Sequence, residues 1–214
     1  MRRGILIVLL CALLSTSSKQ VPTGLTEKCG RRLNEVEPGD LVFIRTRNGL
    51  WDGVASAASG KKYGFGHVGI VVAPEDSSVI LVAHARGNPI SSESGVIAEP
   101  IQKFAGNASR IGIFRAINVS LARALSVEGK KIASEDIQFD DDFVLNNNKL
   151  YCTELVWVIL RDFLGRDPFL QKEVVFGREI IALRDLEEFK GFKLVFNGPS
   201  ECILTPDIRI ASSG

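Results

Sequence analysis

Short apolar runs separated by turn residues are the main pattern in the first half of the chain. The clearest runs lie at 41–44, 68–72, 79–83 and 111–115, and they are rich in Val, Ile and Leu. Turn-forming residues flank several of them, such as Pro-Gly-Asp before the first and Pro-Glu-Asp-Ser-Ser between the second and third. Short β-branched runs with such boundaries are typical of strands. We therefore expect a group of strands here, with 68–72 and 79–83 forming a hairpin.

Two helical patterns follow in the second half. The segment 120–133 is expected to form a helix with Ser120 as its N-cap. The segment 152–164 is strongly apolar and is stopped by Gly165, so it is also expected to be a helix. Between them, 134–149 is acidic and then rich in Asn, which predicts a long loop.

Three weaker patterns complete the expected elements. They are a helix at 50–59, one or two helical turns within 98–105, and a strand at 192–196. The order, strands first and long helices later, predicts one domain of the α+β class.

The two histidines of the chain lie at the outer ends of the predicted hairpin. If its turn is centred between Glu75 and Asp76, His67 and His84 are direct cross-strand partners. Such partners have Cβ atoms about 4.5–5.5 Å apart, close enough for the two imidazoles to form a hydrogen bond. A β-bulge would shift this register, and the alternative is a pair of surface histidines at the end of a hairpin.

Cys152 is expected in the first turn of the apolar helix. The helix dipole and free backbone N–H groups at that position lower a thiol pKa and favour the thiolate. A thiolate nucleophile, an imidazole that accepts its proton and a second group that orients the imidazole form a cysteine-hydrolase site. The backbone N–H of Cys152 is also expected to stabilise an oxyanion. The alternative is a small buried cysteine in the core.

A metal site is another use for one cysteine and two histidines. Structural zinc takes four ligands, usually in closely spaced pairs, and this sequence has no CxxC or HxxxH spacing around Cys152, His67 and His84. Glu154 could complete such a set, whereas a copper site would need an axial Met and the only Met is Met1. We expect no metal and no cofactor.

Composition and charge narrow the class of protein. The chain has 214 residues, 45% of them hydrophobic, and a formal net charge of +1. These values are typical of a globular domain rather than a disordered chain. No basic run is present of the kind that neutralises phosphates, so a nucleic-acid partner is not expected.

The N-terminus has the pattern of a secretory signal peptide. Two arginines precede a ten-residue apolar run and then a group of Ser and Thr residues, which predicts a signal peptide over 1–18 and a single mature domain over 19–214. The run is too short to cross a bilayer. We therefore expect an exported protein with no stable membrane anchor.

Export would allow disulfide formation by the cysteines and N-glycosylation of two asparagines. Cys11 would leave with the signal peptide, and Cys29 and Cys202, near the two ends of the mature chain, could form a disulfide that leaves Cys152 free. The alternative is that all three remaining cysteines are buried thiols. Asn107 and Asn118 stand in Asn-x-Ser sequons and are candidate N-glycosylation sites in a eukaryotic secretory pathway.

Four motifs together resemble one family. They are Gly-Asp-Leu-Val-Phe at 39–43, Gly-His-Val-Gly-Ile-Val at 66–71, Val-Ala-His-Ala at 82–85 and Tyr-Cys-Thr-Glu-Leu-Val at 151–156. In content and order they resemble the circularly permuted NlpC-type cysteine hydrolases of the YiiX/YebB-like group, over about residues 36 to 165. The resemblance implies a permuted papain-like α+β fold, in which an antiparallel sheet packs against the helix that carries the catalytic cysteine.

The resemblance also implies residue roles. Cys152 would be the nucleophile, His67 the general base and acid, and His84 the residue that orients His67. Tyr151 and Asn146 would contribute oxyanion or substrate contacts. The expected activity is hydrolysis of an amide or ester in a peptide, acyl-amide or lipid substrate.

Two other functions stay open on the same fold. One is an acyltransferase of the lecithin:retinol type, although that group resembles an Asn-Cys-Glu-His-Phe motif and this chain has Tyr-Cys-Thr-Glu-Leu. The other is a binding module that kept the fold without turnover.

Overall fold

The structure is a computed structural model that describes residues 36–47, 63–73, 79–87 and 94–201. The predicted signal peptide, the helix expected at 50–59, and the predicted disulfide between Cys29 and Cys202 lie outside these residues. So does Cys11.

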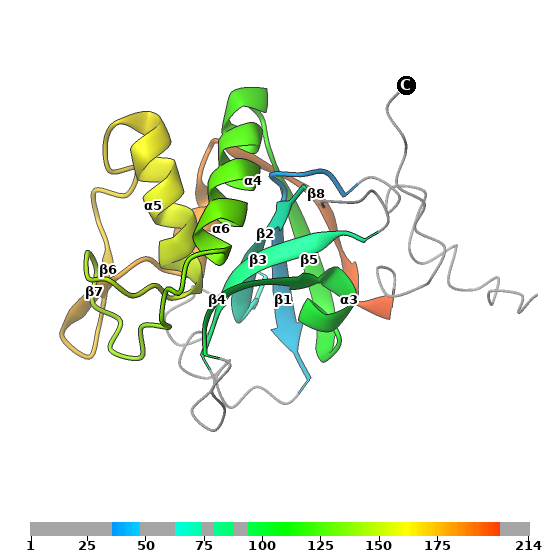
Figure 1. Cartoon of the computed structure of the whole chain (residues 1–214), viewed down its shortest axis with the longest axis horizontal. Coiled ribbons are helices and arrows are strands. Elements are labelled where there is room, and N and C mark those ends of the chain that lie inside the picture. The colour runs from blue at the N-terminus through cyan, green and yellow to red at the C-terminus, as the bar shows by residue number, and fades with distance from the viewer. Residues whose placement is uncertain (1–35, 48–62, 74–78, 88–93, 202–214) are drawn as a thin grey trace, which may run out of the picture.

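Six strands form one antiparallel sheet in the order β4-β3-β2-β1-β5-β8 (Figure 1). The strands are β1 (Leu41–Thr46), β2 (His67–Val72), β3 (Leu81–Arg86), β4 (Gly95–Pro100), β5 (Ala108–Ala116) and β8 (Phe192–Pro199). A separate two-stranded hairpin consists of β6 (Glu173–Val175) and β7 (Arg178–Ile180). The mixture of an antiparallel sheet with helices confirms the predicted α+β class.

Helices cover the two faces of the sheet unequally. The described helices are α3 (Ile101–Phe104), α4 (Val119–Ala133), α5 (Cys152–Leu164) and α6 (Leu183–Glu188). Successive strand residues point to opposite faces, so each face has its own apolar core. The larger core lies between the sheet and α4, α5 and α6, and the smaller one lies under α3. In Figure 1, α4 and α5 are on one side of the sheet and α3 is on the other.

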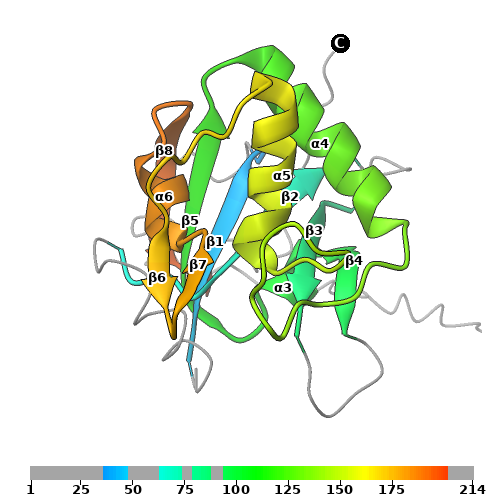
Figure 2. The same ribbon diagram turned by 90° about the vertical axis from the view of Figure 1, so that its left-hand side faces the viewer.

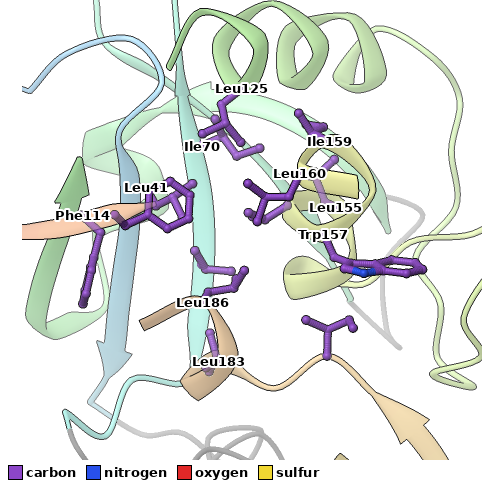
Figure 3. Close-up of a cluster of buried hydrophobic side chains, with 14 of the residues drawn as sticks. Leu41, Ile70, Phe114, Leu125, Leu155, Trp157, Ile159, Leu160, Leu183 and Leu186 are labelled. Carbon is purple, nitrogen blue, oxygen red and sulfur yellow. The ribbon is translucent and has the colours of Figure 1, made fainter. Parts of the chain in front are cut away.

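The larger core fixes the position of α5. Leu155 and Leu160 of α5 are fully buried and face Leu41 and Ile70 of the central strands (Figure 3). Leu125 of α4 belongs to the same core and is also fully buried. Figure 2 shows α4 and α5 lying side by side across this face. Burial of several aliphatic side chains, each worth about 1.5–3 kcal/mol, holds the first turn of α5 against the sheet.

One local prediction is wrong, and two are confirmed. The N-cap of α4 is Asn118 rather than Ser120, because the Asn118 side chain accepts hydrogen bonds from the N–H groups of Ser120 and Leu121 at 2.8 and 3.2 Å. The helical turn expected within 98–105 is α3, which covers 101–104, and the residues before it, 98–100, are the end of β4. As predicted, α5 ends at Gly165, which has a φ of 65°.

The predicted hairpin forms, but its register is different. Ile70 pairs with Ala83, Val71 with Val82 and Val72 with Leu81. Each pair differs by two positions from the predicted register, so His67 and His84 are not direct cross-strand partners. A shift of two residues keeps both side chains on the same face of the sheet, and they still lie close together.

Candidate active site

The two histidines form a hydrogen-bonded pair on the α3 face of the sheet. His67 begins β2, His84 lies within β3, and the Nε2 of His67 is 2.9 Å from the Nδ1 of His84. The rings meet edge to face, with their centroids 5.1 Å apart. Phe104 of α3 packs against both rings. The pair is therefore held between two strands and covered by an aromatic side chain.

Gly69 provides the space for this pair. A Cβ atom at position 69 would collide with Val82 and come within 3.2 Å of the Cβ of His84. A larger residue at this position would displace His84 or separate the strands.

The hydrogen bonds continue from His84 to Glu99, a residue that the sequence analysis did not identify. The Nε2 of His84 is 3.1 Å from the Oε1 of Glu99. The second carboxylate oxygen, Oε2, contacts the Nη1 of Arg86 at 3.4 Å and the Nζ of Lys103 at 3.2 Å. We refer to His67, His84 and Glu99 as the hydrogen-bond chain.

The protonation states along the hydrogen-bond chain follow from its partners. The hydrogen bond from His84, aided by Lys103, lowers the pKa of Glu99 to about 2. Burial lowers the pKa of His84 despite the neighbouring carboxylate, and burial lowers that of His67 to about 3. Both imidazoles are therefore neutral near neutral pH, and Glu99 is a carboxylate.

Cys152 is the first residue of α5, as predicted, and is a free, half-buried thiol. Its N-cap, Tyr151, forms no side-chain cap, so the first N–H groups of the helix have no capping partner there. The backbone N–H groups of Val68, Thr153 and Cys152 act on the thiol and favour its ionised form.

The expectation of a lowered thiol pKa is nevertheless wrong. Burial is the largest influence, and it raises the pKa of Cys152 to about 11. Desolvation of the sulfur outweighs the helix terminus and the three N–H groups. In the free protein, the thiol is therefore neutral at neutral pH.

Cys152 and the hydrogen-bond chain approach β2 from opposite faces of the sheet. Cys152 packs against the larger core, whereas His67 lies on the face of the smaller one, beside Ile44 of β1. The thiol reaches the strand at the N–H of Val68, the residue directly after His67. Within the described residues, we find no hydrogen bond from Cys152 to either histidine.

Tyr151 and Asn146 both make hydrogen bonds within the described part of the chain. The hydroxyl of Tyr151, which is buried, accepts a hydrogen bond of 2.9 Å from the N–H of Ile181. The side-chain oxygen of Asn146 accepts one of 2.9 Å from Arg161, more than two turns along α5 from Cys152. These contacts anchor the segments around α5, and the oxyanion or substrate contacts expected of Tyr151 and Asn146 stay predictions.

Glu154 is a buried carboxyl group in the first turn of α5, two residues after Cys152. Its Oε1 accepts a hydrogen bond of 3.2 Å from the N–H of Asn146, and its Oε2 has no hydrogen-bond partner in the described part of the chain. Burial raises the pKa of Glu154 to about 7, with Asp140 adding to the effect.

These contacts also bear on the metal alternative. Both ring nitrogens of His84 are engaged by His67 and Glu99, and Glu154 is hydrogen-bonded to the backbone at Asn146. Among the described residues, no three or more His, Cys, Asp or Glu side chains are grouped so that they could hold a metal ion. The donor set does not fit a metal, and we derive no step through one.

Two further sequence predictions concern the surface and the membrane. The sequon residues Asn107 and Asn118 are both exposed, so their glycosylation stays a prediction. None of the helices in the described ranges has the length and apolar character needed to cross a membrane.

Comparisons with known proteins agree with the fold. One crystal structure, that of the metalloprotein yiiX from Escherichia coli O157:H7, is similar with a TM-score of 0.58 and 15% sequence identity. The similarity covers 75% of this chain and 96% of that one. A comparison with curated proteins found no match.

A family comparison is more specific. Residues 35–183 match the family described as permuted papain-like amidase enzymes, YaeF/YiiX, C92 family. This range covers more than half of the chain and includes Cys152, His67, His84 and Glu99. The chain therefore belongs to the permuted papain-like amidase family and is a cysteine hydrolase with that fold.

Proposed function

We propose that this protein cleaves an amide or ester bond through an acyl-enzyme on Cys152, with His67 as general base and acid and His84 as its orienting residue. The observation that best supports these roles is the 2.9 Å hydrogen bond between His67 and His84, next to the Val68 N–H that faces the Cys152 thiol. The base is thereby held at the same point of β2 that the nucleophile approaches.

The first half of the reaction forms the acyl-enzyme. The Sγ of Cys152 attacks the carbonyl carbon of the substrate as its proton passes to the Nδ1 of His67, the nitrogen not bonded to His84. The backbone N–H of Cys152 donates to the oxyanion that forms. The C–N or C–O bond then breaks, and the leaving amine or alcohol takes the proton from His67.

The second half regenerates the enzyme. A water molecule attacks the thioester carbon while His67 accepts one of its protons. The C–S bond breaks, the thiol recovers its proton from His67, and the substrate leaves as a carboxylic acid. No oxidant, reductant or cofactor is needed.

The pKa values favour a general-base form of this reaction. Because burial raises the pKa of Cys152 and lowers that of His67, the resting pair is a neutral thiol and a neutral imidazole. The proton then moves during the attack on the carbonyl. This differs from a thiolate and imidazolium formed before substrate binds.

The substrates that we propose are amides, either peptides or acyl-amides, with esters or lipids as related acyl donors. We also propose that the protein acts after export, because residues 1–18 have the pattern of a signal peptide.

An acyl donor with a coloured leaving group tests the proposed function. The mature protein is mixed with p-nitrophenyl acetate, quenched in acid and digested, and the acetyl group is located by mass spectrometry. We expect acetylation at Cys152, followed by release of acetic acid. The matched variant Cys152→Ala should show neither. Acetylation only at other residues, or turnover that survives in Cys152→Ala, would overturn the proposal.

A further inference from the structure

Glu99 is the end of the hydrogen-bond chain and has the most partners in it. It is 7% exposed, and it lies on β4, where its strand partner is Val82. His84 pairs with Ile97 of the same strand, so Glu99 and His84 are diagonal neighbours on one face of the sheet. The β3–β4 register therefore brings the carboxylate to the ring of His84.

The partners of Glu99 determine where protons lie in the hydrogen-bond chain. A carboxylate can only accept, so the Nε2 of His84 must donate to it. A neutral His84 then has a lone pair on Nδ1, and the Nε2 of His67 must donate to that atom at 2.9 Å. The lone pair of His67 is thereby on Nδ1.

Arg86 and Lys103 stabilise this arrangement against its main competitor. If His84 were protonated, its Nδ1–H would donate to His67, and the proton of His67 would move to Nδ1. The positive charges of Arg86 and Lys103 lower the pKa of His84 and so oppose that state. Arg86 and Lys103 contact the Oε2 of Glu99, whereas His84 contacts its Oε1.

We propose that Glu99 is a positioning residue that acts through His84 to fix the tautomer of His67 with a basic Nδ1. The effect of this tautomer on catalysis rests on the proposed function, in which Nδ1 is the atom that accepts the proton of Cys152. When His67 becomes protonated, the negative charge of Glu99 also stabilises the imidazolium. The tautomers themselves can be measured without any substrate.

The variant Glu99→Gln separates this role from a merely structural one. The positive charges of Arg86 and Lys103 lie beside Oε2 and favour an oxygen there over an NH₂ group, so the glutamine oxygen should face them and its NH₂ group should face His84. That orientation inverts the hydrogen-bond chain and places the proton of His67 on Nδ1. We expect a loss of about 10²–10⁴-fold in kcat, comparable to the cost of a misplaced tautomer in other nucleophile–histidine sites.

The tautomers are measured by nitrogen NMR of the protein labelled with a nitrogen isotope in its histidines. The chain has only two histidines, so four ring-nitrogen signals report both tautomers. We expect protons on both Nε2 atoms in the wild type and on both Nδ1 atoms in Glu99→Gln. The control Glu154→Gln, which removes another buried carboxylate, should leave the wild-type pattern. Thermal unfolding of each variant is measured alongside.

Several results would overturn the inference. One is a wild-type spectrum with the His67 proton on Nδ1, which needs no variant to fold. Another is a Glu99→Gln protein with unchanged tautomers or unchanged kcat. Failure of the proposed function looks different, because Cys152 would then not be acylated even though the tautomers are as expected.

Discussion

Two buried carboxylates near the candidate site have opposite pKa shifts. Glu99 lies beside His67 and His84, which we call the histidine side, and Glu154 lies in the first turn of α5 with Cys152, which we call the cysteine side. Glu99 has three donors around it, and the hydrogen bond from His84 lowers its pKa to about 2. Glu154 has the N–H of Asn146 on one oxygen and no hydrogen-bond partner for the other in the described segments. Burial accordingly raises the pKa of Glu154 to about 7.

The difference shows that burial alone does not decide the charge of these groups. Both side chains are less than one tenth exposed, so desolvation acts against ionisation in each. Glu99 stays ionised because donors and positive charges offset that cost. The histidine side therefore carries the negative charge of Glu99. On the cysteine side, burial favours the neutral forms of both Glu154 and Cys152.

Loss of the base should have the largest effect on activity. His67→Ala removes the proton acceptor for Cys152, and we expect kcat/KM for p-nitrophenyl acetate to fall by about 10²–10⁴-fold. Added imidazole should restore part of the rate if the variant is folded. Wild-type turnover in His67→Ala would mean that the histidine side has no part in the chemistry.

The pH dependence of alkylation tests the neutral state of the cysteine side. Only the thiolate reacts with iodoacetamide, and the pKa of Cys152 is raised to about 11. The rate at Cys152, followed by peptide mapping, should therefore rise about tenfold per pH unit from about pH 7 to about pH 10. A rate that is already high and constant near about pH 6 would show a preformed thiolate and imidazolium pair.

Glu154→Gln should change how stability depends on pH. The folded pKa of about 7 is above the ordinary value of 4.5, so ionisation destabilises the folded wild type. The cost is absent below the unfolded pKa, grows as pH rises and is complete above the folded pKa, where it reaches up to about 3 kcal/mol.

The variant lacks this titration. Relative to the wild type, its free energy of unfolding should be higher at about pH 8 than at about pH 4, as measured by denaturant titration. Comparing the two pH values cancels any fixed cost of the amide. Parallel pH profiles for the two proteins would show that Glu154 is ionised at no cost.

Gly69→Ala should have the smallest effect, confined to the histidine side. The added methyl group would press on Val82 and His84, and displacement of the hydrogen-bond chain should lower kcat by about tenfold. Gly129→Ala in α4 is the control, since its nearest contacts would be 3.4 Å away. It should keep full activity and gain about 0.5–1 kcal/mol of stability. Equal activity in the two variants would argue against a tight fit around His84.

The elements with strong local patterns could be predicted from the sequence. The cores of β1, β2, α4 and α5 were expected within a few residues, because their apolar periodicity and turn residues are local signals. The position of Cys152 at the start of α5 followed from the same signals. His67 and His84 were expected to be close, and they are, although the register was wrong.

What the sequence did not reveal depends on pairing and burial. Glu99 becomes a partner of His84 only through the β3–β4 register, and its segment was expected to be helical. The β6–β7 hairpin was missed because its turn is Phe176-Gly177, with φ values of 51° and 78°, where Asn-Gly is the usual signal. The raised pKa of Cys152 comes from tertiary burial, which no local pattern records.

In the proposed mechanism, His67 accepts the proton of Cys152 from the opposite face of β2, with its Nδ1 toward the sulfur. A crystal structure of the protein after reaction with a peptide aldehyde tests this arrangement, since the aldehyde carbon bonds to Sγ and its oxygen mimics the oxyanion. We predict a covalent bond to Cys152, the His67 Nδ1 within hydrogen-bond distance of the sulfur or the new oxygen, and Nε2 still bonded to His84. A modified Cys152 with His67 directed elsewhere, or with its Nε2 toward the sulfur, would show that His67 is not the base in this tautomer.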